Sequence, residues 1–431
     1  MMPKADGVTW PTAPLSRLVR IVGGGTPSKT RADFWQGAIP WVSPKDMLDR
    51  ELRDAADHIT ETAVEKSATQ IVPPGSVLVV VRSGILAHRF PVSLTRTAVA
   101  LNQDMKALLP GGPLIPEFLA YALEAKSDYV LRHCVKRGAT VHSVDMGRFQ
   151  QVCVPVPPLP EQRRIVEILD QADRLRRLRA EAEVKADRIL PALFIAMFGD
   201  PRTNPRGWNT GKMGDALVET RDGTSARSHS DGAGVLVLRM NSISVAGRID
   251  LADARYAELE RRKIERLALF PGDLVFNRTN SAERVGKTGL WSRSDVPAVP
   301  ASYLIRCRVN RAKVTPEYIW ALMNTPFMKS ALAAKAMRAI GMANINASEL
   351  RRLPALFPPL DCQEAFVTRL RQLDELMERF DKGGQSVERL FSLLLQLAFS
   401  GNLTVYWREA HMKELLHEIE DQAKLIEEVT L

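Results

Sequence analysis

The chain changes character in its middle, where it reads Val154-Pro155-Val156-Pro157-Pro158-Leu159-Pro160-Glu161-Gln162-Arg163-Arg164-Ile165-Val166. Pro160 suits the first turn of a helix, where its missing N–H costs nothing, and Glu161 suits the positive end of the helix dipole. Apolar residues then follow in steps of three, four or seven, which form one stripe along a helix: Ile165, Leu169, Ala172, Leu175, Ala182, Ala186, Ile189 and Leu193. The pattern predicts a helix from Pro160 to Phe198, about 58 Å long if continuous, that Pro191 interrupts near its end. A helix of this length cannot fold back into its own small domain.

The same design recurs closer to the C-terminus. After Pro358-Pro359-Leu360, Asp361 is a suitable N-cap, and Glu364 completes a box-like pattern. The apolar stripe that follows stops at Gly383-Gly384 and resumes after Ser386. We expect the two apolar stripes to bury each other, so that the two long helices form an antiparallel coiled-coil pair.

Four short motifs occur twice, in the same order and at nearly constant spacing. The pairs are Pro74-Gly75-Ser76-Val77-Leu78-Val79 with Pro271-Gly272-Asp273-Leu274-Val275-Phe276, Pro116-Glu117-Phe118-Leu119 with Pro316-Glu317-Tyr318-Ile319, Pro157-Pro158-Leu159 with Pro358-Pro359-Leu360, and Phe198-Gly199-Asp200 with Phe399-Ser400-Gly401. The spacing lies between 197 (Gly75 to Gly272) and 201 (Pro157 to Pro358). It predicts a tandem duplication with a unit of about 200 residues, which is far too long for a solenoid repeat.

Each unit is expected to contain a domain of mixed α and β structure. Short β-type runs such as Ser76–Val81 and Val92–Leu101 are bounded by turn residues, and a helical pattern extends from Ile115 to Leu131. The predicted fold class is therefore α/β (α+β), with two tandem globular domains, two long helices and a pseudo-two-fold internal repeat. The predicted limits are 1–157 and 201–357 for the domains, 158–200 and 358–401 for the helices, and 402–431 for a helical C-terminal extension.

Composition narrows the class of protein. The 431 residues are 45% hydrophobic and 25% charged, which is the balance of an ordinary globular protein. The net charge is +9, with a pI near 9.4, and this excess favours a polyanionic partner. No apolar run reaches the ~18–20 residues of a membrane span, and the first residues lack the hydrophobic region of a secretory signal. We expect a cytoplasmic protein with no membrane partner.

No arrangement of residues points to catalysis or to a bound metal. The four cysteines form no C-x-x-C pair, and none of the seven histidines stands beside a second ligand at metal-binding spacing. Gly286-Lys287-Thr288 ends like a phosphate-binding loop, but Ser281 stands where that motif needs glycine, so a basic hairpin tip is the better interpretation. No G-x-S-x-G motif is present. We expect no catalytic residue, no metal ligand and no cofactor bound by this chain, and hence a binding function.

Basic and polar side chains follow corresponding strands in the two units. Arg82-Ser83-Gly84 comes after the run that ends at Val81, and Asn277-Arg278-Thr279-Asn280 comes after the run that ends at Phe276. Arg can bond guanine and Asn can bond adenine in the major groove, while Lys, Ser and Thr hold phosphates. For any single residue a solvated turn is the alternative. The predicted contacts to double-stranded DNA are Lys29, Arg82, Ser83, Arg89, Arg96, Arg239, Asn241, Arg278, Thr279, Asn280, Arg284 and Lys287.

The sequence from Val154 to Val166, followed by a long helix, resembles the central region of type I restriction–modification specificity (S) subunits. Further similar segments cover almost the whole chain: Gly24-Gly25-Thr26-Pro27-Ser28 with Ile39-Pro40-Trp41-Val42, Leu101-Asn102-Gln103-Asp104, Gly207-Trp208, and Gly401-Asn402-Leu403-Thr404 before Trp407-Arg408. One departure is that Cys362 stands at the position of Glu161, and Asp361 at that of Pro160. The second helix start is therefore capped differently.

The resemblance implies a DNA reader without catalysis, whose target recognition domains, 1–157 and 201–357, each read one half of a split, asymmetric sequence. The helical pair would set the spacing of the halves and dock two modification (M) subunits, which carry S-adenosylmethionine and methylate adenine. Restriction (R) subunits would add ATP- and Mg-dependent translocation and cleavage. The same resemblance assigns M-subunit docking to Glu161, Gln162, Arg163, Arg164, Gln363 and Glu364.

Other interpretations remain open at this point. A fused methyltransferase or nuclease would need a cofactor loop or a carboxylate cluster, and the sequence shows neither. A non-catalytic helical scaffold would have no salt-sensitive affinity for DNA. A third interpretation is the specificity subunit of a related methyltransferase system that lacks a restriction subunit. The acidic segment from His411 to Glu428 predicts an amphipathic helix that packs on the long helices or on an M subunit, or that stays solvated.

Overall fold

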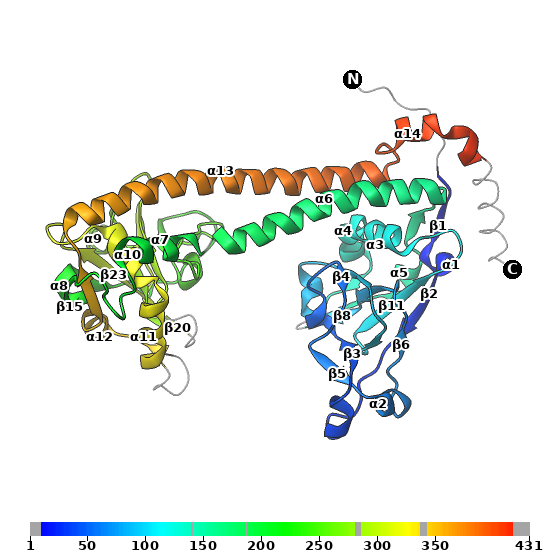
Figure 1. Ribbon diagram of the computed structural model, residues 1–431, viewed down its shortest axis with the longest axis horizontal. Coiled ribbons are helices and arrows are strands. Elements are labelled where there is room, and N and C mark those ends of the chain that lie inside the picture. Colours follow the sequence, from blue (N-terminus) through cyan, green and yellow to red (C-terminus); the bar gives the residue numbers. More distant parts are fainter. Residues whose placement is uncertain (1–9, 139–140, 187, 281–285, 337–342, 417–431) are drawn as a thin grey trace. The chain divides into compact units, whose positions relative to one another are not determined.

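The computed structural model describes residues 10–138, 141–186, 188–280, 286–336 and 343–416. The chain divides into two compact units (Figure 1). Unit 1 comprises residues 1–177 and 384–431, and unit 2 comprises residues 178–383. Each unit thus joins one domain of mixed α and β structure to part of each long helix.

Unit 1 is built on a five-stranded sheet. Its central strand β7 (Val77–Val80) is apolar throughout and fully buried, so both of its faces contribute to the core. Strand β7 pairs antiparallel with β9 (Val92–Thr95) on one side and with β11 (Met105–Pro110) on the other. The order in the sheet is β2-β11-β7-β9-β4, with β2 at Val19–Gly23 and β4 at Glu51–Leu52.

The described residues of unit 1 form three further sheets. They are β5-β3-β10-β6 (Asp57–Ile59, Ile39–Val42, Val99–Leu101, Ile71–Val72), β12-β13-β8 (Val135–Lys136, His142–Val144, Arg82–Ser83) and β1-β14 (Thr12–Pro14, Cys153–Pro155). The run Val92–Leu101, which we expected to be one strand, forms β9 and β10 in different sheets. The chain turns at Arg96-Thr97 to cross from one sheet to the other.

Unit 2 repeats this arrangement. Its largest sheet has the order β16-β23-β19-β21, which matches β2-β11-β7-β9 of unit 1, and β17 pairs parallel with β22 as β3 does with β10. The matching topology confirms the duplication predicted from the sequence. The strands are β15 (Asn209–Lys212), β16 (Leu217–Asp222), β17 (Val235–Leu238), β18 (Tyr256–Ala257), β19 (Leu274–Asn277), β20 (Thr279–Asn280), β21 (Thr288–Leu290), β22 (Ala298–Pro300), β23 (Leu304–Val309), β24 (Ala343–Asn344) and β25 (Pro354–Phe357).

The repeated Pro-Gly motif has a backbone cause. Gly75 and Gly272 both adopt a positive φ, +84° and +96°, immediately before the central strands β7 and β19. A residue with a side chain is strained in this conformation, so glycine is required at the turn that starts each central strand. This explains why the motif stands at the same place in both units.

The first long helix forms where the sequence predicts it and is interrupted as expected. Helix α6 spans Leu159–Ala186, and α7 spans Ile189–Phe198. Pro191 lacks the N–H that would continue the helical ladder, so the interruption falls on the N-terminal side of the proline. The predicted interruption by Pro191 is confirmed.

The second long helix corrects one prediction. Helix α13 is continuous from Leu360 to Phe399, so it does not stop at Gly383-Gly384. Asp361 lies within the first turn and is not the N-cap. A glycine inside a helix costs about 1 kcal/mol relative to alanine. Two such residues do not break a helix whose two ends are packed against domains.

The long helices contribute to the hydrophobic core of each unit. In unit 1, Ile165 and Leu169 of α6 and Phe391 and Ala398 of α13 are buried in the same cluster as the central sheet. The ion pair between Arg176 and Glu388 (3.1 Å) shows that the two helices lie side by side there. In unit 2, Phe194 and Phe198 of α7 pack both against Tyr318 and against Phe366 of α13, with ring centroids 4.9 to 6.0 Å apart.

Shorter helices cover the sheets and the C-terminal region. They are α1 (Leu15–Leu18), α2 (Glu61–Glu65), α3 (Pro116–Ala125), α4 (Ser127–His133), α5 (Met146–Gln150), α8 (Met213–Ala216), α9 (Arg261–Leu267), α10 (Pro316–Met323), α11 (Pro326–Ala336), α12 (Ala347–Arg351) and α14 (Val405–Ala410). In the part of the chain that the structure covers, no helix is long and apolar enough to cross a membrane. Most of the acidic segment predicted as a helix, residues 417–428, lies outside the described residues.

Candidate nucleic-acid interface

The small sheet β12-β13-β8 carries the basic tip of unit 1. Arg82 in β8 has a side chain that is 63% exposed and lies 3.3 Å from one carboxylate oxygen of Asp104. Ser83 faces His142 of β13 in the ladder, and its hydroxyl accepts a hydrogen bond from the backbone N–H of Ile85. Arg82 is therefore largely free to contact a polyanion, whereas Ser83 is used to cap a turn.

The corresponding tip of unit 2 is held more tightly. Strand β20 pairs with β24, and the Arg278 guanidinium donates to Asp222 Oδ1 (2.6 Å) and to Asn344 Oδ1 (3.2 Å). The Thr279 hydroxyl also donates to Asn344 Oδ1 (3.1 Å). Only 22% of the Arg278 side chain is exposed. In the ladders of the two small sheets Arg82 corresponds to Thr279, so Arg278 lies one residue before the matching position, and it first stabilises its own turn.

Three other predicted contacts have structural roles inside their units. Arg96 forms ion pairs with Glu51 (2.8 Å) and Glu117 (2.7 Å), and its hydrogen bond holds the pKa of the Glu51 carboxyl below the usual range. The Lys287 ammonium donates to backbone carbonyls of the segment 240–243, and Arg239 pairs with the Asp253 carboxylate. These side chains join segments that are far apart in the sequence.

The remaining predicted contacts divide by exposure. Lys29, Arg89 and Asn241 are exposed, and Arg89 also donates to the backbone carbonyl of Met47 (3.1 Å). The backbone of Asn280 belongs to β20, but its side chain lies outside the described residues, as does all of Arg284.

The structure brings further polar residues to these tips that sequence reasoning missed. Lys136 and Arg137 are exposed at the end of β12, beside His142 on β13, and Asn344 lies under Arg278. The signal was available, because Asn344 lies 201 positions after Ser143 of β13, the same spacing as the repeated Pro-Pro-Leu motif. Extending the repeat beyond the central strands would have paired β13 with β24.

The two glutamines predicted to dock a partner are internal. Gln162 and Gln363 are fully buried. The Gln162 amide donates to the carbonyls of Pro113 (2.6 Å) and Pro157 (2.8 Å), and its oxygen accepts from the N–H of Ile115 (3.0 Å). Gln363 makes the same three bonds in unit 2, to Lys313, Pro358 and Thr315. Each glutamine thus locks the start of a long helix to the start of α3 or α10.

Glu161 is also internal, which corrects its expected place on a docking surface. It is fully buried, and its carboxylate accepts hydrogen bonds from Trp10 Nε1 (2.9 Å), Thr404 Oγ1 (2.6 Å) and Arg408 Nε (2.7 Å). These bonds join the N-terminal segment, α6 and the C-terminal extension. In unit 2 the corresponding residue is Cys362.

Of the six residues assigned to docking, three remain at the surface. Arg163 and Glu364 are exposed, and Arg164 is partly exposed and pairs with Glu167 (2.6 Å). Any contact between these helix starts and a partner protein must therefore use these side chains and their neighbours, because the buried glutamines and Glu161 are already satisfied within the chain.

Comparison with known proteins identifies the chain. A family described as the type I restriction modification DNA specificity domain matches residues 7–186. The type I restriction enzyme EcoKI specificity subunit of Escherichia coli (strain K12) is 24% identical over 449 aligned positions, which cover 97% of this chain and 94% of that protein. Residues 7–186 thus belong to this family, and the similarity to type I restriction–modification specificity subunits extends along nearly the whole chain. The resemblance seen in the sequence is confirmed.

Other members of the specificity-subunit family match in part or in fold. The EcoR124I/EcoR124II specificity subunit of Escherichia coli is 40% identical over 173 residues, which cover 40% of this chain and 42% of that protein. A solved structure from a study of complex assembly and conformational transition of the type I R-M system has a TM-score of 0.57 at 14% identity. It covers 93% of this chain and 100% of its own, so the fold is shared along nearly the whole chain.

Proposed function

We propose that this chain is the DNA-reading subunit of a type I complex, and that each unit reads one half of a bipartite, asymmetric site through the major groove. Membership of the specificity-subunit family carries the assignment to DNA sequence specificity. The observation that supports a split site is the duplicated topology, which presents a basic tip on a small sheet in each unit. Two similar readers in one chain suit two short half-sites better than one continuous site.

The chemistry belongs, in this proposal, to partner proteins. Two M subunits would dock on the long helices and carry S-adenosylmethionine, and R subunits would supply ATP- and Mg-dependent cleavage. Within the residues that the structure describes, no group of three or more His, Cys, Asp or Glu side chains could hold a metal ion. A role in the cytoplasm, beside the chromosomal DNA, follows from this function. The scaffold interpretation is not favoured, because it does not account for the family.

The proposed function predicts a split methylation site with salt-dependent binding. The full chain, purified with M subunits, should bind such a site and methylate one adenine in each half, and the affinity should fall steeply as salt rises. Mapping of methylated adenines in genomic DNA, with and without the gene, identifies the site. A gel-shift series in increasing salt tests the binding. The absence of methylated split sites, or an affinity that does not depend on salt, would contradict the proposal.

Replacement of Arg82 tests the tip of unit 1 as a base reader. The Arg82→Ala complex should bind its specific site more weakly by about 1–3 kcal/mol, because a bidentate contact to guanine is lost. The side chain is mostly exposed, so the fold should be unaffected. Affinity is measured on the specific site and on a scrambled duplex. An equal loss on both duplexes would reassign Arg82 to phosphate contact.

Arg278→Ala is the informative comparison within the same chain. Because Arg278 also bonds Asp222 and Asn344, its removal should weaken specific binding and, in addition, increase hydrogen exchange of the β20–β24 pair. Arg82→Ala should leave exchange of the β8–β13 pair unchanged.

A further inference from the structure

In unit 1 a pair of arginines fills the junction between the domain and the long helices. The Arg50 and Arg176 guanidinium groups each form ion pairs with both Glu124 and Asp173. Arg50 lies 3.7 Å from Asp173, and Arg176 lies 3.7 Å from Glu124 and 3.5 Å from Asp173. Arg176 also stacks over the ring of Phe391, 4.1 Å from its centroid. The two cations are thus held by carboxylates and by aromatic faces, Arg50 over Tyr121 and Phe391 and Arg176 over Phe391.

Unit 2 carries smaller side chains at the corresponding positions. The spacing of the repeat, from Pro116 to Pro316 and from Gln162 to Gln363, defines the correspondence. It aligns Ala321 with Tyr121, Leu190 with Phe391, and Met377 with Arg176. In unit 1 the ring of Tyr121 lies 3.8 Å from the Arg50 guanidinium. All three of these unit 2 residues line one cavity of about 650 Å³. The space that rings and a guanidinium fill in unit 1 is open in unit 2.

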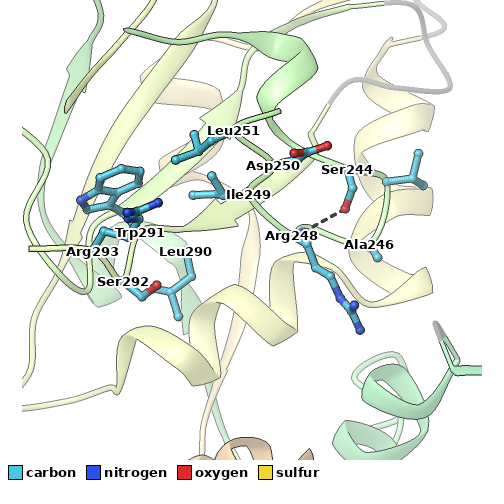
Figure 2. Close-up of a pocket in the computed structure, with 11 residues that line it drawn as sticks. Ser244, Ala246, Arg248, Ile249, Asp250, Leu251, Leu290, Trp291, Ser292 and Arg293 are labelled. Carbon is cyan, nitrogen blue, oxygen red and sulfur yellow. Dashed lines mark hydrogen bonds between the residues drawn. The ribbon is translucent and has the colours of Figure 1, made fainter. Parts of the chain in front are cut away.

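The first of the two arginines has a counterpart in unit 2. Arg50 directly precedes β4, which pairs with β9. In the same way, Arg248 directly precedes Ile249, which lies against Gly289 of β21, the counterpart of β9. Figure 2 shows the Arg248 side chain extending away from Ile249 and Leu251, while its backbone N–H donates to Ser244 Oγ (3.0 Å). Arg248 lines both the cavity drawn there, of about 580 Å³, and the 650 Å³ cavity. The group without a counterpart is the guanidinium of Arg176.

The carboxylate that would bind such a guanidinium is present. Asp374 aligns with Asp173 and lines the cavity, and Asn324 aligns with Glu124. Asn324 is only 5% exposed, and its amide nitrogen donates to the carbonyls of Thr288 and Trp320 (both 2.9 Å). These two bonds determine the orientation of the amide, and they leave the buried Oδ1 without a hydrogen-bond donor. The Oδ1 atom is closed to solvent, so Asn324 is a fixed polar part of the cavity wall.

The charged side chains of the lining are four carboxylates and three cations, which leaves an excess of one acceptor: Glu317, Asp374, Glu378 and Asp381 against Arg248, Lys329 and Arg371. Asp374, Glu378 and Asp381 lie on one face of the helix, at i, i+4 and i+7, and all three line the cavity. Asp381 lies 3.8 Å from Arg179, which leaves Asp374 and Glu378 as the carboxylates nearest to the position of Met377 along the helix. A donor with positive charge and flat apolar faces matches these carboxylates together with the apolar side of the cavity.

We propose that the cavity of unit 2 receives an arginine side chain from a partner protein, in the place that Arg176 fills in unit 1. Its guanidinium pairs with the Asp374 carboxylate, and its stem packs on the apolar lining that includes Leu190. The identity of the partner, an M subunit, rests on the proposed function. The two helix pairs would thus be asymmetric: one junction is closed by the chain itself, and the other is completed by the partner.

A variant that fills its own cavity tests this proposal. Met377→Arg restores the residue that unit 1 carries at Arg176, so the new guanidinium should occupy the cavity and lower the affinity of the full chain for the M subunit by at least about tenfold. The matched control is Leu376→Arg, which adds the same charge one residue earlier at a side chain that is 60% exposed and outside the cavity. It should change the affinity less than twofold. Equal losses in both variants would overturn the proposal.

A second measurement uses the chain alone and separates this proposal from the proposed function. The thermal unfolding midpoint of the full chain should rise more with millimolar arginine amide than with lysine amide, and the difference should disappear in Met377→Arg and in Asp374→Asn. Equal effects of the two amides, or an undiminished effect in Met377→Arg, would overturn the arginine site. If the complex showed no DNA sequence specificity, the proposed function would be contradicted, but the thermal-shift result for the arginine site would still stand.

Discussion

Replacement of Glu161 by Gln is expected to destabilise the junction of α6 with the C-terminal extension by about 3–5 kcal/mol. The variant leaves the Arg408 guanidinium buried without its countercharge. It also replaces one of the two carboxylate oxygens, which now accept three hydrogen bonds, by an amide N–H₂. Whichever oxygen is replaced, either Trp10 Nε1 or Arg408 Nε then faces another donor. No comparable loss is expected from an exposed ion pair.

Hydrogen exchange of residues 402–416 measures this effect in the full chain. Because a two-unit protein need not unfold in one step, a local opening free energy is a better quantity than a single midpoint. Exchange of this segment should accelerate at least about a hundredfold, since each 1.4 kcal/mol corresponds to a factor of ten. The control is Glu167→Gln, which removes the exposed partner of Arg164. The double variant Glu161→Gln/Arg408→Gln should recover part of the loss, and an additive double variant would contradict the buried pair.

Exchange of residues 1–157 for the same domain of another specificity subunit is expected to change one half of the methylated site and to leave the other half unchanged. The domain ends cleanly for this purpose, because β14 pairs with β1 and α6 begins at Leu159. The recognised sequence of that half should change completely, because the residues that contact the bases are all part of the exchanged domain. Methylation mapping of the chimeric complex gives the result directly.

The donor domain must keep the contacts that attach the domain to the helices. Trp10 bonds Glu161, Arg50 reaches Asp173 (3.7 Å), and Tyr121 donates to Asp170 (2.7 Å). A donor with these three domain residues keeps the junction of unit 1. The reciprocal exchange of residues 201–357 should change the other half. If both halves changed in one chimera, or neither did, the division of reading between the units would be contradicted.

The long helices illustrate what a sequence pattern predicts well. The stripe that begins at Ile165 predicted α6 within a residue at its start, and Pro191 predicted the break before α7. Both depend only on neighbours along the chain, which periodicity and proline chemistry report directly. Gly383-Gly384 was misread because the cost of glycine in a helix is small and local, while the contacts that keep α13 continuous come from residues far away in the sequence.

The candidate DNA contacts show the corresponding limit. Arg82 and Arg278 were placed at matching tips correctly, because the repeat and the strand pattern are visible in the sequence. Their different exposure was not predictable, since it depends on whether a carboxylate from a distant strand reaches the guanidinium, as Asp222 reaches Arg278. For the same reason Arg96 was interpreted as a surface contact although it bridges Glu51 and Glu117.

The amino-acid sequence alone revealed two copies of one unit, each followed by a long helix, and no catalytic motif. Repeats and apolar periodicity can be recognised from the order of residues along the chain. Only the tertiary structure showed which polar groups are hydrogen-bonded inside the molecule, namely Glu161, Gln162 and Gln363. It also revealed the cavity beside Met377. The reason is physical. A hydrogen bond or an ion pair acts over about 3 to 4 Å in space, and the distance between residues that are 200 positions apart is decided by how the sheets and helices pack.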